Sequence, residues 1–564
     1  MAAGEGGQKV DEFQPHPVKD QLPGVDVCAS SSPSWPEAVF LGFQHYLVML
    51  GTTVLIPTIL VPLMGGGNKE KAEVINTLLF VAGLNTLTQT LFGTRLPVVM
   101  GGSYAFIIPT VSIAISNRFN IYVDPHEWFK QSMRAIQGAL IIASLFHMII
   151  GFFGFWRIFG RFLSPLAAVP LVTLTGLGLY ALGFPQLAKC VEIGLPALVI
   201  LVLVSQYIPH MLKSRRGTIE RFSVLFTVAV VWGYAEILTL AGAYDRRSLK
   251  TQLSCRTDRS GLLSAAPWIR IPYPFQWGLP SFNAGDSFAM MASSLVAIIE
   301  STGTFIAASR YGSATPMPPS VLSRGIGWQV ANNFIISHFI MCYTLWPQVL
   351  ISRYWFKIFY SQGIGILLDG AFGTGSGTTA SVENAGLLGL TRNGSRRVVQ
   401  ISAGFMIFFS ILGKFGAVLA SILLPIVAAL YCVFFAYVGS AGLSFLQFCN
   451  LNSFRTKFIL GFSLCMGLSV PQYFNEYVVT SGHGPVHSGS TAFNNIFQVI
   501  FSSPATVAII VAYFLDCTHS VKHSETRRDS GRHWWTKFRY FERDSRSEEF
   551  YLLAFKLNRF FPSI

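Results

Sequence analysis

Near the middle of the chain lies Glu383-Asn384-Ala385-Gly386-Leu387-Leu388-Gly389-Leu390-Thr391-Arg392, which follows the segment 373–381 with the sequence GTGSGTTAS. It lies in a very apolar part of the chain, where hydrocarbon depth is expected. A charged residue there costs about 2.5–3.5 kcal/mol on insertion scales, and such residues mark functional sites by default. A carboxylate beside an amide at this depth therefore indicates a binding site in a membrane protein.

The composition agrees with a membrane protein. Of 564 residues, 51% are hydrophobic and only 12% are charged, which excludes a water-soluble globule of this size. The net charge of +14 is typical of cytoplasmic loops in a membrane chain, so we expect no nucleic-acid partner. The eight cysteines form no C-x-x-C pair, and we expect neither a zinc site nor a disulfide framework, but buried small side chains.

About 20 apolar residues cross a bilayer, and this length predicts fourteen spans. Two of them, 97–116 and 374–391, are interrupted by Gly and Ser, and the ninth ends near Phe372. The other eleven lie near 37–61, 74–93, 136–156, 164–184, 191–211, 221–243, 287–308, 398–419, 424–446, 455–472 and 497–516.

The basic residues predict the orientation. Residues 1–36 contain no apolar signal-peptide core, so we expect a disordered cytoplasmic N-terminus. Lys and Arg then concentrate in the turns predicted to be cytoplasmic and in the tail 517–564, as the positive-inside rule requires. The predicted extracellular loop 244–286 is the exception, because it carries six basic residues.

The two interrupted spans are third in the first seven, 37–243, and third in the second seven, 287–516. This coincidence is typical of transporters built from inverted repeats, with the binding site at the membrane midplane. Broken spans leave backbone groups unpaired, and such groups are tolerated at depth only where protein or a ligand satisfies them.

The signature Glu383, Asn384, Gly386, Thr391 and Arg392 resembles that of the nucleobase–ascorbate transporter family within the xanthine/uracil permeases, and it is closest to the plant branch. That family's pattern is Gln/Glu/Pro-Asn-x-Gly, four free positions, then Thr-Arg or Thr-Lys. The resemblance also covers Gln44-His45, 101–106 and 300–304. It implies an all-α, uracil-permease-like fold of two inverted seven-span repeats, with a core domain (spans 1–4 and 8–11) and a gate domain (5–7 and 12–14). It also implies a homodimer in the plasma membrane.

Two carboxylates are the main site candidates. Glu300 lies in the middle of the eighth span, where a ligand's N–H groups would offset its cost, since charge-assisted hydrogen bonds are the strong ones. The alternative is a structural carboxylate bonded to Ser or Thr hydroxyls. We expect Glu383 near the start of a half-helix, whose dipole favours an anion; the alternative is a plain helix cap. The resemblance implies that both bind the base and couple protons.

Six further residues complete the expected site. Tyr104 offers an aromatic face to a planar base beside Ser103, or else packs in the core or against lipid. Asn384 and the Gln44-His45 pair are substrate-binding by resemblance, although a buried His is also a common packed core residue. Thr304 stands where several relatives carry a titratable residue, so proton coupling must rely on Glu300 and Glu383.

These features predict a proton-coupled nucleobase symporter with an elevator-like mechanism and no cofactor or metal beyond the proton gradient. Gly413-Lys414 lacks the rest of a P-loop, and neither H-E-x-x-H nor G-x-S-x-G occurs, so we expect neither an ATP-driven pump nor an enzyme. The alternatives are an ascorbate carrier and an anion exchanger of the same fold.

One segment does not match the family pattern. Residues 330–362 separate flanks that relatives join directly, and their apolar run contains Pro347 and is short for a span. We predict a retained intron in the gene model or an extruded hairpin; a non-functional splice product is the corresponding alternative for the whole chain.

Overall fold

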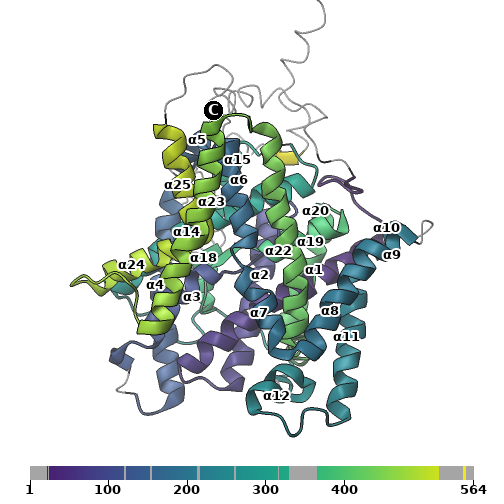
Figure 1. Ribbon diagram of the computed structural model, residues 1–564. Coiled ribbons are helices and arrows are strands. Elements are labelled where there is room, and N and C mark those ends of the chain that lie inside the picture. Colours follow the sequence, from purple (N-terminus) through teal and green to yellow (C-terminus); the bar gives the residue numbers. More distant parts are fainter. Residues whose placement is uncertain are drawn as a thin grey trace, which may run out of the picture.

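The computed structural model describes residues 22, 24–119, 122–152, 155–211, 216–259, 262–315, 317–328, 365–519 and 550–553. Helices dominate it (Figure 1). Within these residues seven helices are long and apolar enough to cross a membrane, or up to nine if each of two bent pairs is one span. The insertion predicted at 330–362 lies outside the described residues.

The helices of the first half are α1 (Trp35–Leu63), α2 (Asn68–Leu91), α3 (Ile107–Ala114), α4 (Pro125–Phe152), α5 (Phe155–Phe162), α6 (Pro165–Leu177), α7 (Phe184–Leu187), α8 (Val191–Val202), α9 (Ile208–Met211), α10 (Arg216–Arg221), α11 (Ser223–Leu240), α12 (Leu249–Cys255) and α13 (Leu262–Ala265). Those of the second half are α14 (Ala284–Tyr311), α15 (Pro319–Trp328), α18 (Gly365–Phe372), α19 (Val382–Thr391), α20 (Arg396–Ile411), α21 (Gly413–Ala420), α22 (Leu424–Leu443), α23 (Phe454–Ser481), α24 (Thr491–Phe501) and α25 (Pro504–Thr518).

Both interrupted spans begin without α-helix, as predicted. Strand β1 (Met100–Gly102) leads into α3, and strand β2 (Thr378–Ala380) leads into α19. The strands pair with each other antiparallel, with Met100 opposite Ala380. A Cβ on Gly101 would lie 1.7 Å from the Met49 Cε atom, so the end of the Met49 side chain in α1 would have to move if β1 carried a larger residue here. Backbone groups that have no helical partner in one segment thus form hydrogen bonds with the other segment.

We divide the helices into two sets. The first set is α1, α2, α4, α14, α18, α19 and α20; the second is α6, α8, α11, α22, α23 and α25. Helices α14 and α19 of the first set contact the second set, α14 through α6 and α25 and α19 through α22. The site lies at this junction.

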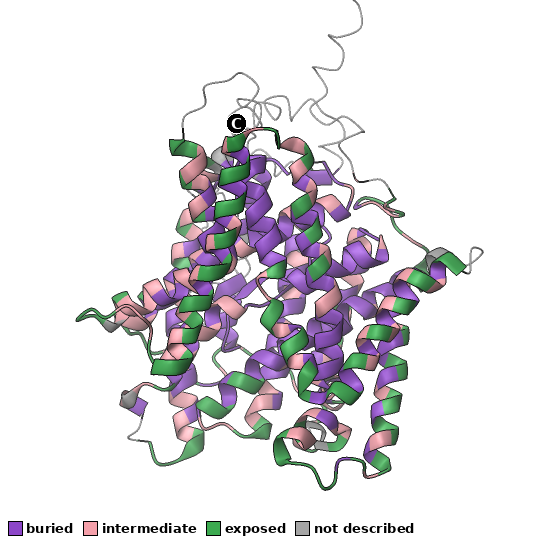
Figure 2. Cartoon of the chain, viewed as in Figure 1, coloured by how far each residue is buried: buried purple, intermediate pink, exposed green. Residues whose placement is uncertain are grey.

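The outer surface is apolar where lipid is expected. Figure 2 shows exposed positions along α11 and α23, whereas the interior of the bundle is buried. On α11 the large exposed side chains Phe226, Val230, Tyr234 and Ile237 recur at helical spacing and form one stripe. An exposed apolar stripe of this length suits contact with lipid.

One prediction about cysteine is wrong. Cys190, at the start of α8, and Cys255, at the end of α12, form a disulfide across a sequence separation of 65 residues. Local spacing gave no sign of it, because the pair depends on α12 packing back onto the chain around residue 190. The five other cysteines that the structure describes form no disulfide.

Candidate functional site

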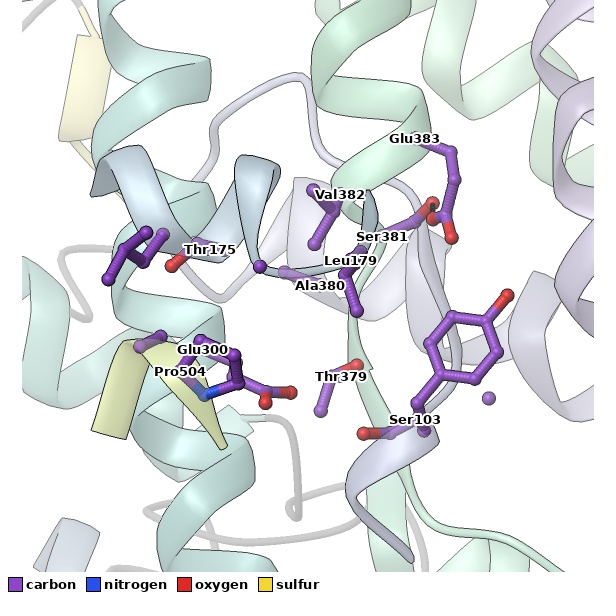
Figure 3. A pocket seen from close by; sticks show the side chains of 15 residues that line it. Ser103, Thr175, Leu179, Glu300, Thr379, Ala380, Ser381, Val382, Glu383 and Pro504 are labelled. Atoms are coloured by element: carbon purple, nitrogen blue, oxygen red, sulfur yellow. Dashed lines mark hydrogen bonds between the residues drawn. The ribbon is translucent and has the colours of Figure 1, made fainter. Parts of the chain in front are cut away.

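The candidate site is a pocket at the junction of the two helix sets (Figure 3). It contains four of the predicted residues, Ser103, Tyr104, Glu300 and Glu383. The other lining residues are Gly102, Leu174, Thr175, Gly178, Leu179, Thr379, Ala380, Ser381, Val382, Pro504 and Ala505. The space inside the pocket that water-sized groups can occupy is about 30 Å³, so a larger ligand requires the pocket to widen.

Glu300 enters the pocket from α14 of the first helix set. Figure 3 shows its carboxylate directed toward Thr379. Its Oε1 atom accepts a hydrogen bond of 3.0 Å from the hydroxyl of Ser503, which itself accepts one of 3.0 Å from Thr506. Ser503 is the N-cap position of α25, so the positive end of that helix dipole faces the carboxylate. Glu300 therefore has the Ser hydroxyl partner that a purely structural carboxylate would need, but its carboxylate also lines the pocket.

Glu383 enters from the first turn of α19, where the sequence predicted it, and is 2% exposed. Its Oε2 atom accepts a hydrogen bond of 2.8 Å from Ser381, the N-cap residue of that helix. Its Oε1 atom is buried and has no hydrogen-bond partner among the described residues. An unsatisfied buried acceptor costs about 1–3 kcal/mol, and more when charged. A ligand that donates a hydrogen bond to this oxygen would remove that cost.

The predicted residues Asn384, His45 and Gln44 lie outside the pocket lining. The Nδ1 atom of His45 is 2.8 Å from Asn384 Oδ1, and Asn384 Nδ2 donates to Ser381 Oγ over 3.0 Å. These bonds form a chain from α1 to the N-cap of α19, so His45 and Asn384 position the helix turn that carries Glu383. Gln44 is fully buried, and neither of its amide atoms has a partner among the described residues.

Thr304 and Asp369 also lie away from the pocket lining. The hydroxyl of Thr304 donates to the backbone carbonyl of Glu300 over 3.0 Å, so it is engaged within α14. Asp369, in α18, accepts hydrogen bonds from the hydroxyls of Thr378 and Thr374. It therefore braces strand β2 from behind.

The rest of the signature anchors α19. A Cβ on Gly386 would lie 2.3 Å from the carbonyl oxygen of Phe434, so this glycine lets α19 pack directly on α22. At the other end of α19, Arg392 has a φ of 51° and pairs through Nε with Glu220 at 2.9 Å, while Thr391 bonds within the helix. In the signature, Glu383 and Asn384 thus line or support the pocket, whereas Gly386, Thr391 and Arg392 hold α19 in place.

Sequence reasoning missed the contribution of the second helix set. Ser503, Pro504 and Thr175 line or support the pocket but belong to no motif. The available signal was Ser503-Pro504 inside the predicted span 497–516, because Ser at the N-cap and Pro at the first helical position mark a helix that restarts. The structure has this break, with α24 and α25 bent by 81°.

Comparison with known proteins identifies the family of the chain. The model of a family described as "Permease family" matches residues 36–328 and 345–476. Nucleobase-ascorbate transporter 4 of Arabidopsis thaliana is 67% identical over 98% of this chain and 99% of its own length, and transporter 6 is 61% identical over 100% and 99%. Nucleobase-ascorbate transporter LPE1 of Zea mays is 57% identical over 99% of both.

Among solved structures, the transmembrane domain of a cyanobacterium bicarbonate transporter, BicA, aligns with a TM-score of 0.38 at 13% identity, over 85% of this chain and 97% of that chain. This similarity is too low to support an argument. The plant relatives are all named transporters, which confirms the prediction that the chain is not an enzyme. From its signature, its apolar helices and the extent of these matches, the chain belongs to the nucleobase–ascorbate transporter family and is a multi-pass membrane transport protein.

Proposed function

We propose that the protein is a proton-coupled symporter of nucleobases. The observation that carries this proposal is the placement of two carboxylates, Glu300 and Glu383, on one pocket, with one oxygen of Glu383 lacking any partner among the described residues. The plant relatives are named for nucleobases and for ascorbate, so the choice between these substrates depends on the chemistry of the pocket.

The pocket suits a planar ligand that donates hydrogen bonds. A carboxylate only accepts, and its bonds to N–H donors are charge-assisted and strong. The edges of uracil and the purines present such donors, and the ring of Tyr104 offers a face on which a planar base can stack. Ascorbate and sulfate are anions, and two carboxylates would repel them. The same pocket therefore favours a neutral base over either anion.

Proton coupling follows from the same pair. A protonated carboxylate loses its charge, so proton uptake and base binding together can neutralise the site before it moves. We propose fourteen spans in two inverted repeats, with the first helix set as core domain and the second as gate domain. In this mechanism the core slides past the gate and exposes the pocket to each side in turn, with both termini cytoplasmic in the plasma membrane and the protein a homodimer.

A substrate panel tests the proposal. In a host without its own base uptake, we expect accumulation of radiolabelled uracil or a purine base, competed by unlabelled base but not by ascorbate or sulfate. Glu127→Gln is the matched control, because Glu127 is a partly exposed carboxylate outside the pocket that pairs with Lys130. Uptake of sulfate or ascorbate in preference to every base would overturn the assignment.

A further inference from the structure

The chain between α11 and α14 is held at two places, and the first is covalent. The Cys190–Cys255 disulfide ties the end of α12 to the start of α8, and both residues are buried. Beside it, Arg256 pairs with Asp245 and Asp258, and these carboxylates, Asp258 foremost, raise the pKa of its guanidinium. The Thr257 hydroxyl donates to Glu236 of α11. Residues 245–258, the disulfide anchor, are therefore fixed to the second helix set.

The second attachment is polar and belongs to the first helix set. Arg270 pairs with Glu73 of α2 at 3.2 Å, and its backbone N–H donates to Ile411 of α20 over 2.9 Å. The indole N–H of Trp277 donates to the carbonyl of Gly373 over 2.9 Å, directly after α18. Gln276 adds a bond of 3.0 Å to the Thr77 hydroxyl of α2. We name residues 266–281 the polar anchor.

The loop thus connects the two helix sets at one end of the bundle, where Figure 1 shows α12 below α8 and α11. We propose that it is a strap that limits how far the outer ends of the two sets separate. This inference rests on the proposed function, because only an alternating-access carrier needs the sets to move.

The chain length between the anchors sets the limit. Arg259 ends the short helix next to the disulfide anchor, and α13, which packs against α2 and α21, begins at Leu262. Three peptide steps of 3.8 Å separate these two residues, so their Cα atoms can never lie more than about 11 Å apart. Larger relative movement of the sets has to detach one anchor.

The disulfide also indicates the side of the membrane. Disulfides persist in oxidising compartments and are rare in the cytosol, so the strap belongs on the outer face, as the sequence predicted for 244–286. The basic residues that conflicted with the positive-inside rule include Arg256 and Arg270, and both are paired with carboxylates. Part of that conflict is therefore removed.

Added slack tests the strap while the disulfide stays intact. Six Gly and Ser residues inserted directly after Arg259 add up to about 20 Å of reach. With Thr379→Cys as a reporter in the pocket, we expect several-fold faster modification by a membrane-impermeant methanethiosulfonate reagent, read by mass spectrometry of the reporter's peptide. The same insertion after Gly489, in the connection between α23 and α24, should leave the rate unchanged.

The double variant Cys190→Ser/Cys255→Ser should raise the reporter's modification rate as the slack insertion does. An unchanged rate in the slack variant, with the disulfide verified on a non-reducing gel, would overturn the strap. The reporter needs no substrate, so the two proposals fail separately. If the slack insertion raises the modification rate but the protein transports no nucleobase, the proposed function is overturned and the strap stands.

Discussion

Ser503 reaches from the N-terminus of α25 to Glu300 in the middle of α14 and donates a hydrogen bond of 3.0 Å to its Oε1 atom. The two residues are 203 positions apart and belong to different helix sets. The Ser503 hydroxyl makes no capping bond to its own helix. The contact therefore links the site carboxylate to the helix set against which it moves in the proposed mechanism.

Ser503→Ala removes this link without removing a helix cap. A hydrogen bond to a charged group contributes about 1.5–3 kcal/mol, so we expect roughly ten- to hundredfold weaker transport at low substrate concentration. Ser503→Thr keeps the hydroxyl and should keep most of the activity. Initial rates of base uptake, normalised to the amount of protein in the membrane, measure both.

Ser490→Ala is the control for this pair, because the Ser490 hydroxyl does cap its helix, α24, by accepting from the Phe493 N–H. It should lower stability by about 1 kcal/mol and leave the substrate affinity alone. Equal losses of transport in Ser503→Ala and Ser490→Ala would mean that the Ser503 effect is structural.

Glu300→Gln keeps the size and hydrogen-bonding capacity of the side chain but removes its titratable charge. We expect the protein to fold and to exchange base across the membrane, while uphill accumulation driven by a proton gradient is lost. Uptake and exchange assays on the same preparation separate the two activities. Uphill, pH-dependent uptake retained in this variant would show that Glu300 does not couple protons.

Glu383→Gln should change selectivity more than rate. An amide both donates and accepts, whereas a carboxylate only accepts, so bases with an acceptor at this edge, such as oxidised purines, should gain relative to uracil. The test is the ratio of the two uptake rates in competition. A ratio equal to that of the unmodified protein would argue against contact between Glu383 and the substrate.

Gly386→Ala tests the packing of α19. The added Cβ would lie 2.3 Å from a backbone oxygen of Phe434, so α19 has to move away from α22, at a cost of about 1–3 kcal/mol or more. We expect a lower melting temperature and a sharp loss of transport. Gly404→Ala in α20 is the matched control, because its Cβ would meet no atom within 4 Å. Equal behaviour of the two variants would exclude the packing role.

Part of the site could be read from the sequence. The carboxylates Glu300 and Glu383 were costly enough in an apolar chain to be identified, and the Gly-rich stretches marked the two broken spans that meet as β1 and β2. Both signals are local, because each lies within one segment and violates what its surroundings favour.

The remaining features depend on contacts between distant segments. Ser503 looks like an ordinary polar residue until α25 packs on α14, and Cys190 and Cys255 are joined only when α12 folds back. The positions of Gln44, His45 and Asn384 behind the pocket could not be predicted either, since a family pattern names residues without saying which face the ligand. Residues 330–362 stay a prediction from the sequence alone.

The most direct test of the account is proton-driven transport in proteoliposomes of the purified full-length chain. With the membrane potential clamped and the outside made acidic, radiolabelled uracil or a purine base should accumulate above its outside concentration, and a protonophore should abolish this accumulation. The Glu300→Gln protein should only equilibrate the base. Accumulation that persists with the protonophore, or that appears for sulfate or ascorbate and for no base, would contradict the account.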